Sequence, residues 1–198
     1  MIAVQTERVN LRQWRAEDKP LFAAINADPK VMEYFPSTLS RAQSDALVDR
    51  VSNDINLSGW GFWAAERVDT AEFIGFVGIN YSADGLPFAP CVDIGWRLGS
   101  QHWGQGLATE AAHGAMAFAF AQANIEKLVS MTSLANTASE RVMQKLGMIK
   151  APKTFLHPKI AQGHLLQEHV LYQLNRDQWR NNDMVSGKIV TNGKLRKG

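Results

Sequence analysis

A glycine-bearing turn with Gly104 and Gly106 joins a short apolar segment, residues 92–98, to an alanine-rich segment, residues 105–123. Where a turn opens directly into a helix, free backbone N–H groups and the positive end of the helix dipole face whatever lies above them. The two glycines have no Cβ, so a bulky anion can approach the main chain and the turn can adopt positive φ without strain. This combination predicts a binding site for a diphosphate group.

Two other phosphate-binding patterns are missing from the sequence. It contains no G-x-x-x-x-G-K-[ST] motif, which argues against a P-loop. It also lacks a G-x-G-x-x-G motif followed about twenty residues later by a ribose-binding acid, which argues against a dinucleotide site. A Gln-x-x-Gly-x-Gly turn by itself is a weak signal, because glycine turns before helices are common. The assignment therefore depends on a second feature of the chain.

That second feature is the polar segment 136–148, which is predicted to form a helix. Asn136 or Thr137 can cap its N-terminus, and Thr137-x-x-Glu140 matches a capping box. Gly147 is well placed as the C-terminal cap. The same polar residues could instead face a ligand, and the sequence leaves both roles open.

The elements that must position these segments follow from periodicity and from turn residues. Ser40 can cap a helix, and Asp28-Pro29 ends one. No repeat or linker divides the series, so we predict one domain of mixed α and β structure. The expected helices are residues 18–27, 40–55, 105–123 and 137–146, and the expected strands are residues 8–13, 61–68, 72–81, 92–98, 127–133 and 170–174, with a long irregular stretch before the last strand.

Composition is that of an ordinary globular enzyme, with 45% hydrophobic and 20% charged residues. A single cysteine, Cys91, excludes an internal disulfide and suits a reducing compartment. No apolar run is long enough to cross a bilayer, and polar residues around Glu7 replace the apolar core of a signal peptide. We therefore expect a cytoplasmic protein that does not engage a membrane.

The net charge of +2 comes from the C-terminal end, where residues 184–198 hold four basic residues and no acid. Without them the body has 17 basic and 19 acidic residues, so no nucleic-acid partner is expected for the domain. We predict a domain at residues 1–182 and a basic, disordered tail at 183–198. The four residues are Lys188, Lys194, Arg196 and Lys197.

Taken together, the segments 93–110 and 136–148 resemble the GNAT acetyltransferases, in particular the branch that includes ribosomal-protein N-terminal acetyltransferases. Residues 6–14 and 27–32 are similar to the opening of that branch, and residues 169–174 to its last strand. The resemblance covers roughly residues 5–180. It implies the GNAT fold, an α+β (mixed α/β) domain with a mixed, mostly antiparallel sheet flanked by helices. It also implies acetyl transfer from acetyl-CoA to a primary amine by direct attack in a ternary complex.

The resemblance further implies which residues hold acetyl-CoA. Backbone groups of one strand would pair with the pantetheine arm and offer an N–H to the thioester carbonyl, while the glycine turn would take the diphosphate. The second helix would supply an amide and a hydroxyl to the other wall. These candidates are Trp96, Arg97 and Leu98; Trp103, Gly104, Gln105, Gly106, Leu107, Ala108 and Thr109; and Asn136 and Ser139.

For the general base we choose Asp93, which lies in a strand where similar proteins often have glutamate; a structural carboxylate is the competing interpretation. Glu66 is the second candidate. Many GNAT enzymes have a tyrosine near the leaving sulfur, but this chain has Met143 there, which cannot donate a proton. Ser139 or a water molecule is the substitute.

The acceptor pocket is less defined, and the identity of the amine stays open: a protein N-terminus, a lysine or a small molecule. By resemblance its lining candidates are Tyr34, Phe35, Trp60 and Phe62. The alternative function is a catalytically weak acyl-CoA sensor. Homodimerisation also stays open.

Two other kinds of chemistry have little support in the sequence. A covalent mechanism would need Cys91 beside His102 or His113, and nothing sets them adjacent. The five histidines lack metal-ligand spacing, so we expect no metal.

Overall fold

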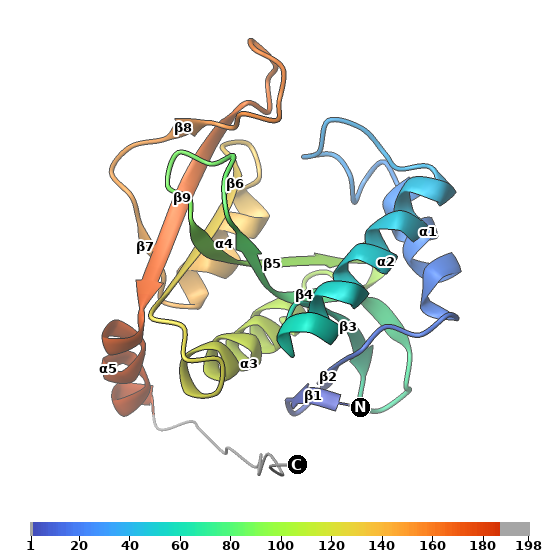
Figure 1. Cartoon of the computed structure of the whole chain (residues 1–198), viewed down its shortest axis with the longest axis horizontal. Coiled ribbons are helices and arrows are strands. Elements are labelled where there is room, and N and C mark those ends of the chain that lie inside the picture. The colour runs from blue at the N-terminus through green and yellow to red at the C-terminus, as the bar shows by residue number, and fades with distance from the viewer. Residues whose placement is uncertain (1, 187–198) are drawn as a thin grey trace.

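Nine strands form one sheet in the computed structural model, which describes residues 2–186. Their order is β1-β2-β3-β4-β5-β6-β9-β7, and β8 also pairs with β9 (Figure 1). Every pairing is antiparallel except that of β5 with β6. The strands are β1 (Ile2–Gln5), β2 (Val9–Arg12), β3 (Phe62–Arg67), β4 (Phe73–Ser82), β5 (Cys91–Leu98), β6 (Lys127–Ser133), β7 (Ile149–Lys150), β8 (Phe155–Leu156) and β9 (Glu168–Asn175).

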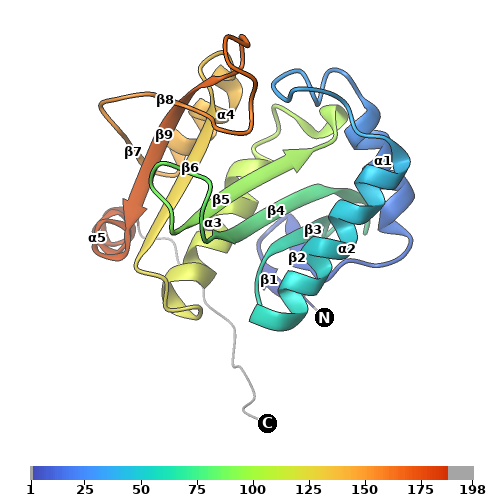
Figure 2. The same ribbon diagram turned by 45° about the horizontal axis from the view of Figure 1, so that its top comes forward.

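Helices cover both faces of this sheet. Neighbouring residues of a strand point to opposite faces, and β3 shows what each face meets. Phe62 packs against Phe76 on the face covered by α1 (Asp18–Ala27) and α2 (Arg41–Ser58), whereas Trp63 packs edge-to-face against Phe118 of α3 (Leu107–Ala121). The ribbon shows α1 and α2 on one side of the sheet and α3 on the other (Figures 1 and 2). In residues 2–186 the helices are α1 (Asp18–Ala27), α2 (Arg41–Ser58), α3 (Leu107–Ala121), α4 (Thr137–Lys145) and α5 (Arg176–Ser186), with a short 3₁₀ turn at Ser100–His102.

The parallel pair β5 and β6 requires a crossover connection, which α3 supplies. Its alanines let the helix pack close to the sheet: Ala111, Ala112 and Ala115 are each at most 1% exposed. The crossover places the turn that begins α3 at the C-terminal end of β5. The fold thus fixes one wall of the candidate site.

The predicted mixed, mostly antiparallel fold is confirmed, and the predicted helices and strands are found with small changes at their ends. Helix α2 begins after Ser40, whose side chain accepts from the Gln43 N–H in a capping box, and it continues to Ser58. Helix α3 begins at Leu107 rather than residue 105, because Gly106 is left-handed at φ 79°. Helix α1 ends at Ala27, directly before Asp28-Pro29, as predicted.

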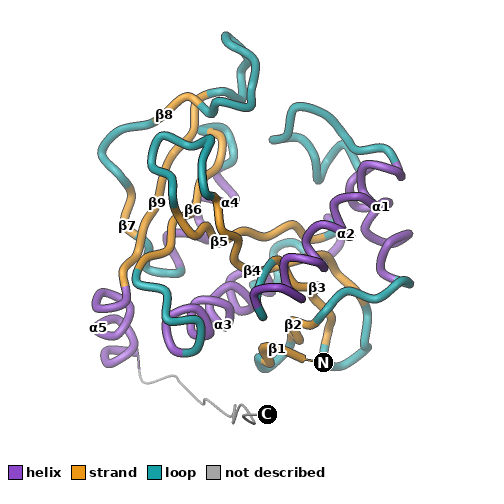
Figure 3. The backbone as a smooth tube through the Cα atoms, in the orientation of Figure 1, coloured by secondary structure: helices purple, strands orange, loops and turns teal. Residues whose placement is uncertain are grey.

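Four short or peripheral elements were not predicted. Strands β7 and β8 have two residues each and lie along β9 inside the stretch expected to be irregular (Figure 3). Strand β1 lies at the edge of the sheet. Helix α5 extends past the expected domain boundary at residue 182 to Ser186. The four basic residues of the expected tail lie outside the described residues.

Among the helices of residues 2–186, none combines the length and the apolar character needed to cross a membrane.

Candidate active site

Strands β5 and β6 meet at one point and then separate. Their one register pair is Asp93 with Val129, beside which the Ser130 hydroxyl donates to the Ile94 carbonyl at 2.9 Å. Toward the C-terminal ends the two strands diverge (Figure 2). The edge of β5 beyond Ile94 is therefore open to a ligand that pairs with main-chain groups.

The direction of the β5 backbone decides which groups this open edge offers. The Gly99 N–H donates to Ile74 of β4 at 3.0 Å, and backbone direction alternates along a strand. Arg97 therefore turns its N–H and C=O toward Phe76 of β4, its register partner, while Trp96 and Leu98 face the open edge. This corrects the expectation for Arg97, whose backbone is part of the sheet.

One main-chain group at the open edge of β5 already has a hydrogen-bond partner within the protein. The Leu98 carbonyl accepts a hydrogen bond from the Trp103 indole Nε1 at 2.9 Å. The N–H and C=O of Trp96 and the N–H of Leu98 remain for a ligand. Trp103 itself is 43% exposed and has Lys30 Nζ over its ring at 5.7 Å.

The conformation of the glycine turn leaves its backbone accessible to an anion. Gly104 and Gly106 are both left-handed, at φ 76° and 79°, and a Cβ placed on Gly104 would meet no atom within 4 Å. Gly106 caps α3 without any side-chain hydrogen bond, so the N–H groups of the first turn of α3 point outward with no side chain capping them. Of the expected turn residues, Leu107 is buried, and Gly104, Gln105 and Gly106 are exposed.

A guanidinium group from the edge of the sheet holds this turn in place. Arg8 donates from Nη1 to the Gln105 carbonyl at 3.0 Å and from Nε to Glu110 at 2.6 Å. Glu110 also accepts from the Thr6 hydroxyl at 2.7 Å, and Arg67 reaches the Gln105 side chain at 3.3 Å. Arg8 and Arg67 could not be predicted from the sequence as part of the site, because nothing in their local pattern connects them to a turn about 40 to 100 residues away.

Asn136 caps α4 and can also face a ligand. Its Oδ1 accepts from the Ser139 N–H at 3.1 Å, and its Nδ2 has no acceptor among residues 2–186. The Thr137-x-x-Glu140 capping box does not form, because Glu140 turns away to the Tyr172 hydroxyl at 2.8 Å and Lys150 at 2.6 Å.

The leaving-group side of the site contains one candidate donor. Met143 is fully buried and belongs to the hydrophobic core. Ser139 is half-buried near the N-terminus of α4, and its hydroxyl has no hydrogen-bond partner among the described residues. Of the two residues, only Ser139 can give a proton.

Asp93 lies on the face of β5 that also carries Gly95 and Arg97. Its carboxylate accepts from Asn80 Nδ2 at 3.0 Å and from the Ser82 hydroxyl at 3.3 Å. Burial raises the pKa of Asp93, and these two hydrogen bonds partly oppose that shift. A carboxylate with a raised pKa and no cationic partner among residues 2–186 is suited to accept a proton.

Glu66, the second candidate for the base, is 6% exposed and held by two arginines. It accepts from Arg12 at 2.7 Å and from Arg15 at 2.9 Å. Arg12 also binds Asp18 through two contacts of 2.7 and 2.9 Å. Glu66 is therefore a structural carboxylate.

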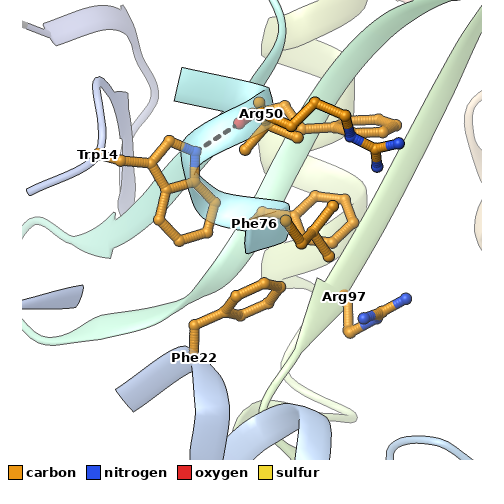
Figure 4. A pocket seen from close by; sticks show the side chains of 8 residues that line it. Trp14, Phe22, Arg50, Phe76 and Arg97 are labelled. Carbon is orange, nitrogen blue, oxygen red and sulfur yellow. Dashed lines mark hydrogen bonds between the residues drawn. The ribbon is translucent and has the colours of Figure 1, made fainter. Parts of the chain in front are cut away.

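An aromatic cavity of about 180 Å³ lies between α1, α2 and the sheet (Figure 4). Of the four acceptor candidates, Phe62 lines it directly. Phe35 stacks on the guanidinium of Arg97, 4.2 Å from ring centroid to Cζ, while Tyr34 and Trp60 are half-buried and do not line it. The lining residues are Trp14, Phe22, Leu47, Arg50, Val51, Phe62, Phe76 and Arg97.

The residues considered for covalent chemistry lie in separate places. His102 faces Glu72 at 3.5 Å, and His113 stacks on Trp179 with ring centroids 4.6 Å apart. Burial raises the pKa of the Cys91 thiol, which disfavours the thiolate. In the part of the chain that is described, no three His, Cys, Asp or Glu side chains group as a metal site.

Comparison with known proteins identifies the family of the chain. The profile of the acetyltransferase (GNAT) domain matches residues 8–149. The chain belongs to the GNAT acetyltransferases. It is an acetyl-CoA-dependent N-acetyltransferase, which confirms the family and the enzyme class predicted from the sequence.

Individual relatives extend the match over most of the chain. The uncharacterized protein YkkB of Bacillus subtilis (strain 168) is 32% identical over 146 residues, covering 72% of this chain and 83% of the relative. The uncharacterized N-acetyltransferase p20 of Bacillus licheniformis is 28% identical over 179 residues, covering 89% and 98%. The crystal structure of RimL, a ribosomal L7/L12 alpha-N-protein acetyltransferase in complex with coenzyme A, shares the GNAT fold at a TM-score of 0.71 and 15% identity, covering 90% of this chain and 99% of that one.

Proposed function

We propose that this GNAT enzyme transfers the acetyl group of acetyl-CoA directly to a primary amine in a ternary complex. The observation that carries the proposal is the open edge of β5 ending at the glycine turn of α3. Main-chain donors and acceptors along the edge suit a pantetheine arm, and outward N–H groups at the turn suit a diphosphate. RimL, which was solved with coenzyme A, has the same fold.

In the proposed complex the diphosphate lies on the turn of Gly104 and Gly106. The pantetheine amides pair with Trp96 and Leu98 on one side and with Asn136 Nδ2 on the other. An N–H of the β5 edge donates to the thioester carbonyl, where negative charge develops during attack. Fixed backbone dipoles of this kind lower the barrier without reorganising.

The acceptor amine then attacks the thioester carbon from the face of α1 and α2. The new N–C bond forms as the C–S bond breaks, the ammonium proton passes to Asp93 through a water molecule, and the thiolate takes a proton from Ser139 or from water. A water relay suits Asp93, because aspartate is one methylene shorter than glutamate. Asn80 and Ser82 hold its carboxylate in place.

Acetyl-CoA binding is tested by thermal melting. A ligand that binds only the native state raises the melting temperature by mass action, so millimolar acetyl-CoA should stabilise the wild-type protein. Gly104→Glu should abolish that shift, because it places bulk and negative charge where the diphosphate must lie.

Gly85→Glu is the matched control for this variant. Gly85 is also left-handed, at φ 77°, and a Cβ there would likewise meet nothing within 4 Å. Both variants should lose similar intrinsic stability, but only Gly85→Glu should keep the acetyl-CoA shift. An unchanged shift in Gly104→Glu would show that the turn is only structural.

Turnover is tested separately, by measuring release of the coenzyme A thiol across a library of primary amines. Release with any amine supports the transferase. Binding of acetyl-CoA without release across the library would favour the alternative function, an acyl-CoA sensor.

A further inference from the structure

The acceptor pocket contains a guanidinium group without a counter-charge. Arg97 donates one hydrogen bond, from Nη1 to the neutral Oδ1 of Asn26 at 2.6 Å. Its Nε is buried without a hydrogen-bond partner, and no described carboxylate lies within ion-pair distance of the group. Figure 4 shows Arg97 at one side of the cavity, beyond Phe76.

The neutral partner of Arg97 is itself held rigidly. Asn26 is fully buried and donates from Nδ2 to Ser44 of α2 at 2.9 Å. This contact fixes the amide so that its oxygen faces Arg97. An amide at this position orients the guanidinium but leaves its charge uncompensated.

Such an arrangement is costly for the protein alone. Burial lowers the pKa of Arg97 to about 10, with no carboxylate opposing the shift. The faces of the guanidinium are covered by Phe35 at 4.2 Å and Phe76 at 5.7 Å. Elsewhere the chain neutralises its buried arginine, Arg12, with two carboxylates. The contrast indicates that the missing anion at Arg97 comes from outside the protein.

A second positive charge lies on the same cavity. Arg50 of α2 is exposed, lines the pocket, and has no ion-pair partner in residues 2–186. The other lining side chains are aromatic or aliphatic. The pocket therefore combines apolar walls with two cations that have no ion-pair partner in the described part of the chain, which suits an organic anion better than a hydrated inorganic one.

We propose that the acceptor amine carries a carboxylate, which binds in this pocket against Arg97 and Arg50. The inference rests on the proposed acetyl transfer. Arg97 and Asp93 share one face of β5, four residues and therefore about 13 Å apart. A substrate held by its carboxylate at Arg97 directs its amine along the strand, past Gly95, toward Asp93 and the thioester.

Glycine at position 95 keeps this path narrow but open. A Cβ on that residue would lie 3.3 Å from the Phe62 ring, so a side chain there would press against the pocket wall. Two guanidinium groups can bind a carboxylate or a phosphate. The carboxylate is favoured because the other walls of the pocket are apolar, and a singly charged group costs less to desolvate there than a phosphate with nearly two charges.

The test uses primary amines in matched pairs on the wild-type protein loaded with coenzyme A. β-Alanine, γ-aminobutyrate and phenylalanine are each compared with their carboxamides, and phosphoethanolamine is added as the phosphate probe. Binding is measured by titration calorimetry and turnover by thiol release with acetyl-CoA. At least one carboxylate should bind about 10- to 100-fold more tightly than its carboxamide.

Arg97→Gln should remove that preference while leaving the affinity for acetyl-CoA unchanged. Its melting temperature should stay the same or rise, because the variant removes a half-buried charge that no carboxylate among residues 2–186 neutralises. Arg41→Gln on the same helix as Arg50 is the control, since Arg41 pairs with Asp45 at 2.8 Å and does not line the pocket. Arg50→Gln is a second test of the carboxylate preference. Arg50 is exposed, so this variant leaves the packing of the core unchanged.

The outcomes are separable from those of the proposed function. Preferential binding of carboxylates without turnover would support the pocket and contradict the proposed direct transfer to the bound amine. Equal binding of carboxylates and carboxamides, tighter binding of phosphoethanolamine, or a preference that survives both arginine variants would each overturn the inference.

Discussion

The substitution Asp93→Asn separates a catalytic carboxylate from a structural one. The amide has nearly the same size, and its oxygen can still accept from Asn80 and Ser82, which now contact the carboxylate at 3.0 and 3.3 Å. What the substitution removes is the ability to take a proton. Activity and stability should then respond in opposite directions.

The activity should fall by about a hundredfold or more in kcat, which is the usual contribution of a positioned general base. That loss corresponds to about 2.7 kcal/mol of transition-state stabilisation. The pH–rate profile should also lose its acidic limb, because in the wild-type enzyme the rate rises with pH as Asp93 ionises.

Stability should move the other way. Burial raises the pKa of Asp93 in the folded protein, so the contribution of this group to stability is fully present below its unfolded pKa and is lost as pH rises through the folded pKa. An asparagine does not ionise and avoids that loss. The variant should therefore melt at the same or a higher temperature than wild type at pH 8, and the difference should shrink toward pH 4.

The assay is thiol release at saturating acetyl-CoA with an accepted amine, repeated from about pH 5 to pH 9 across the expected titration of a shifted carboxylate. Thermal melts of the same samples measure the effect of the substitution on the melting temperature. An unchanged kcat with an intact acidic limb would refute the assignment of Asp93 as base. A variant that melts well below wild type at pH 8 would identify the carboxylate as structural.

Two further predictions concern the framework. Arg12→Met should lower the free energy of unfolding by about 3–5 kcal/mol in denaturant titration, because it leaves the buried carboxylates of Asp18 and Glu66 without this cation. A loss under about 1 kcal/mol would contradict the importance of this ion-pair network. Trp179→Ala should lower the free energy of unfolding by about 3–5 kcal/mol, because this 6% exposed side chain of α5 packs on Phe120. The increase in melting temperature on adding acetyl-CoA should persist in this variant. An unchanged melting temperature without acetyl-CoA would show that α5 does not pack on the domain.

The conformation of the glycine turn and the cap of α4 could be anticipated because their signals are local. Glycine is the residue expected where the backbone must be left-handed, because it has no Cβ. Gly104 and Gly106 are both left-handed. The capping side chain of Asn136 likewise acts within its own helix turn. Such features need only neighbouring residues, so sequence spacing is enough to locate them.

The remaining features depend on contacts between distant segments. No local pattern shows that Glu66 meets Arg12, 54 residues earlier, or that Arg97 meets Asn26, 71 residues earlier. The short strands β7 and β8 form only because β9 offers them an edge. The register with β4 was also needed to see that the backbone groups of Arg97 point into the sheet and away from the open edge.

Because Arg8 contacts the glycine turn, the turn cannot be separated from the N-terminal part of the chain without losing hydrogen bonds. A fragment beginning at residue 9 would keep every residue of the glycine motif, yet it would lose the hydrogen bonds to Gln105 and Glu110 that hold the turn. Transplanting the motif into another protein would fail for the same reason. The proposed donor site therefore depends on the turn together with the first hairpin of the sheet, and the two segments are expected to change in concert when related sequences diverge.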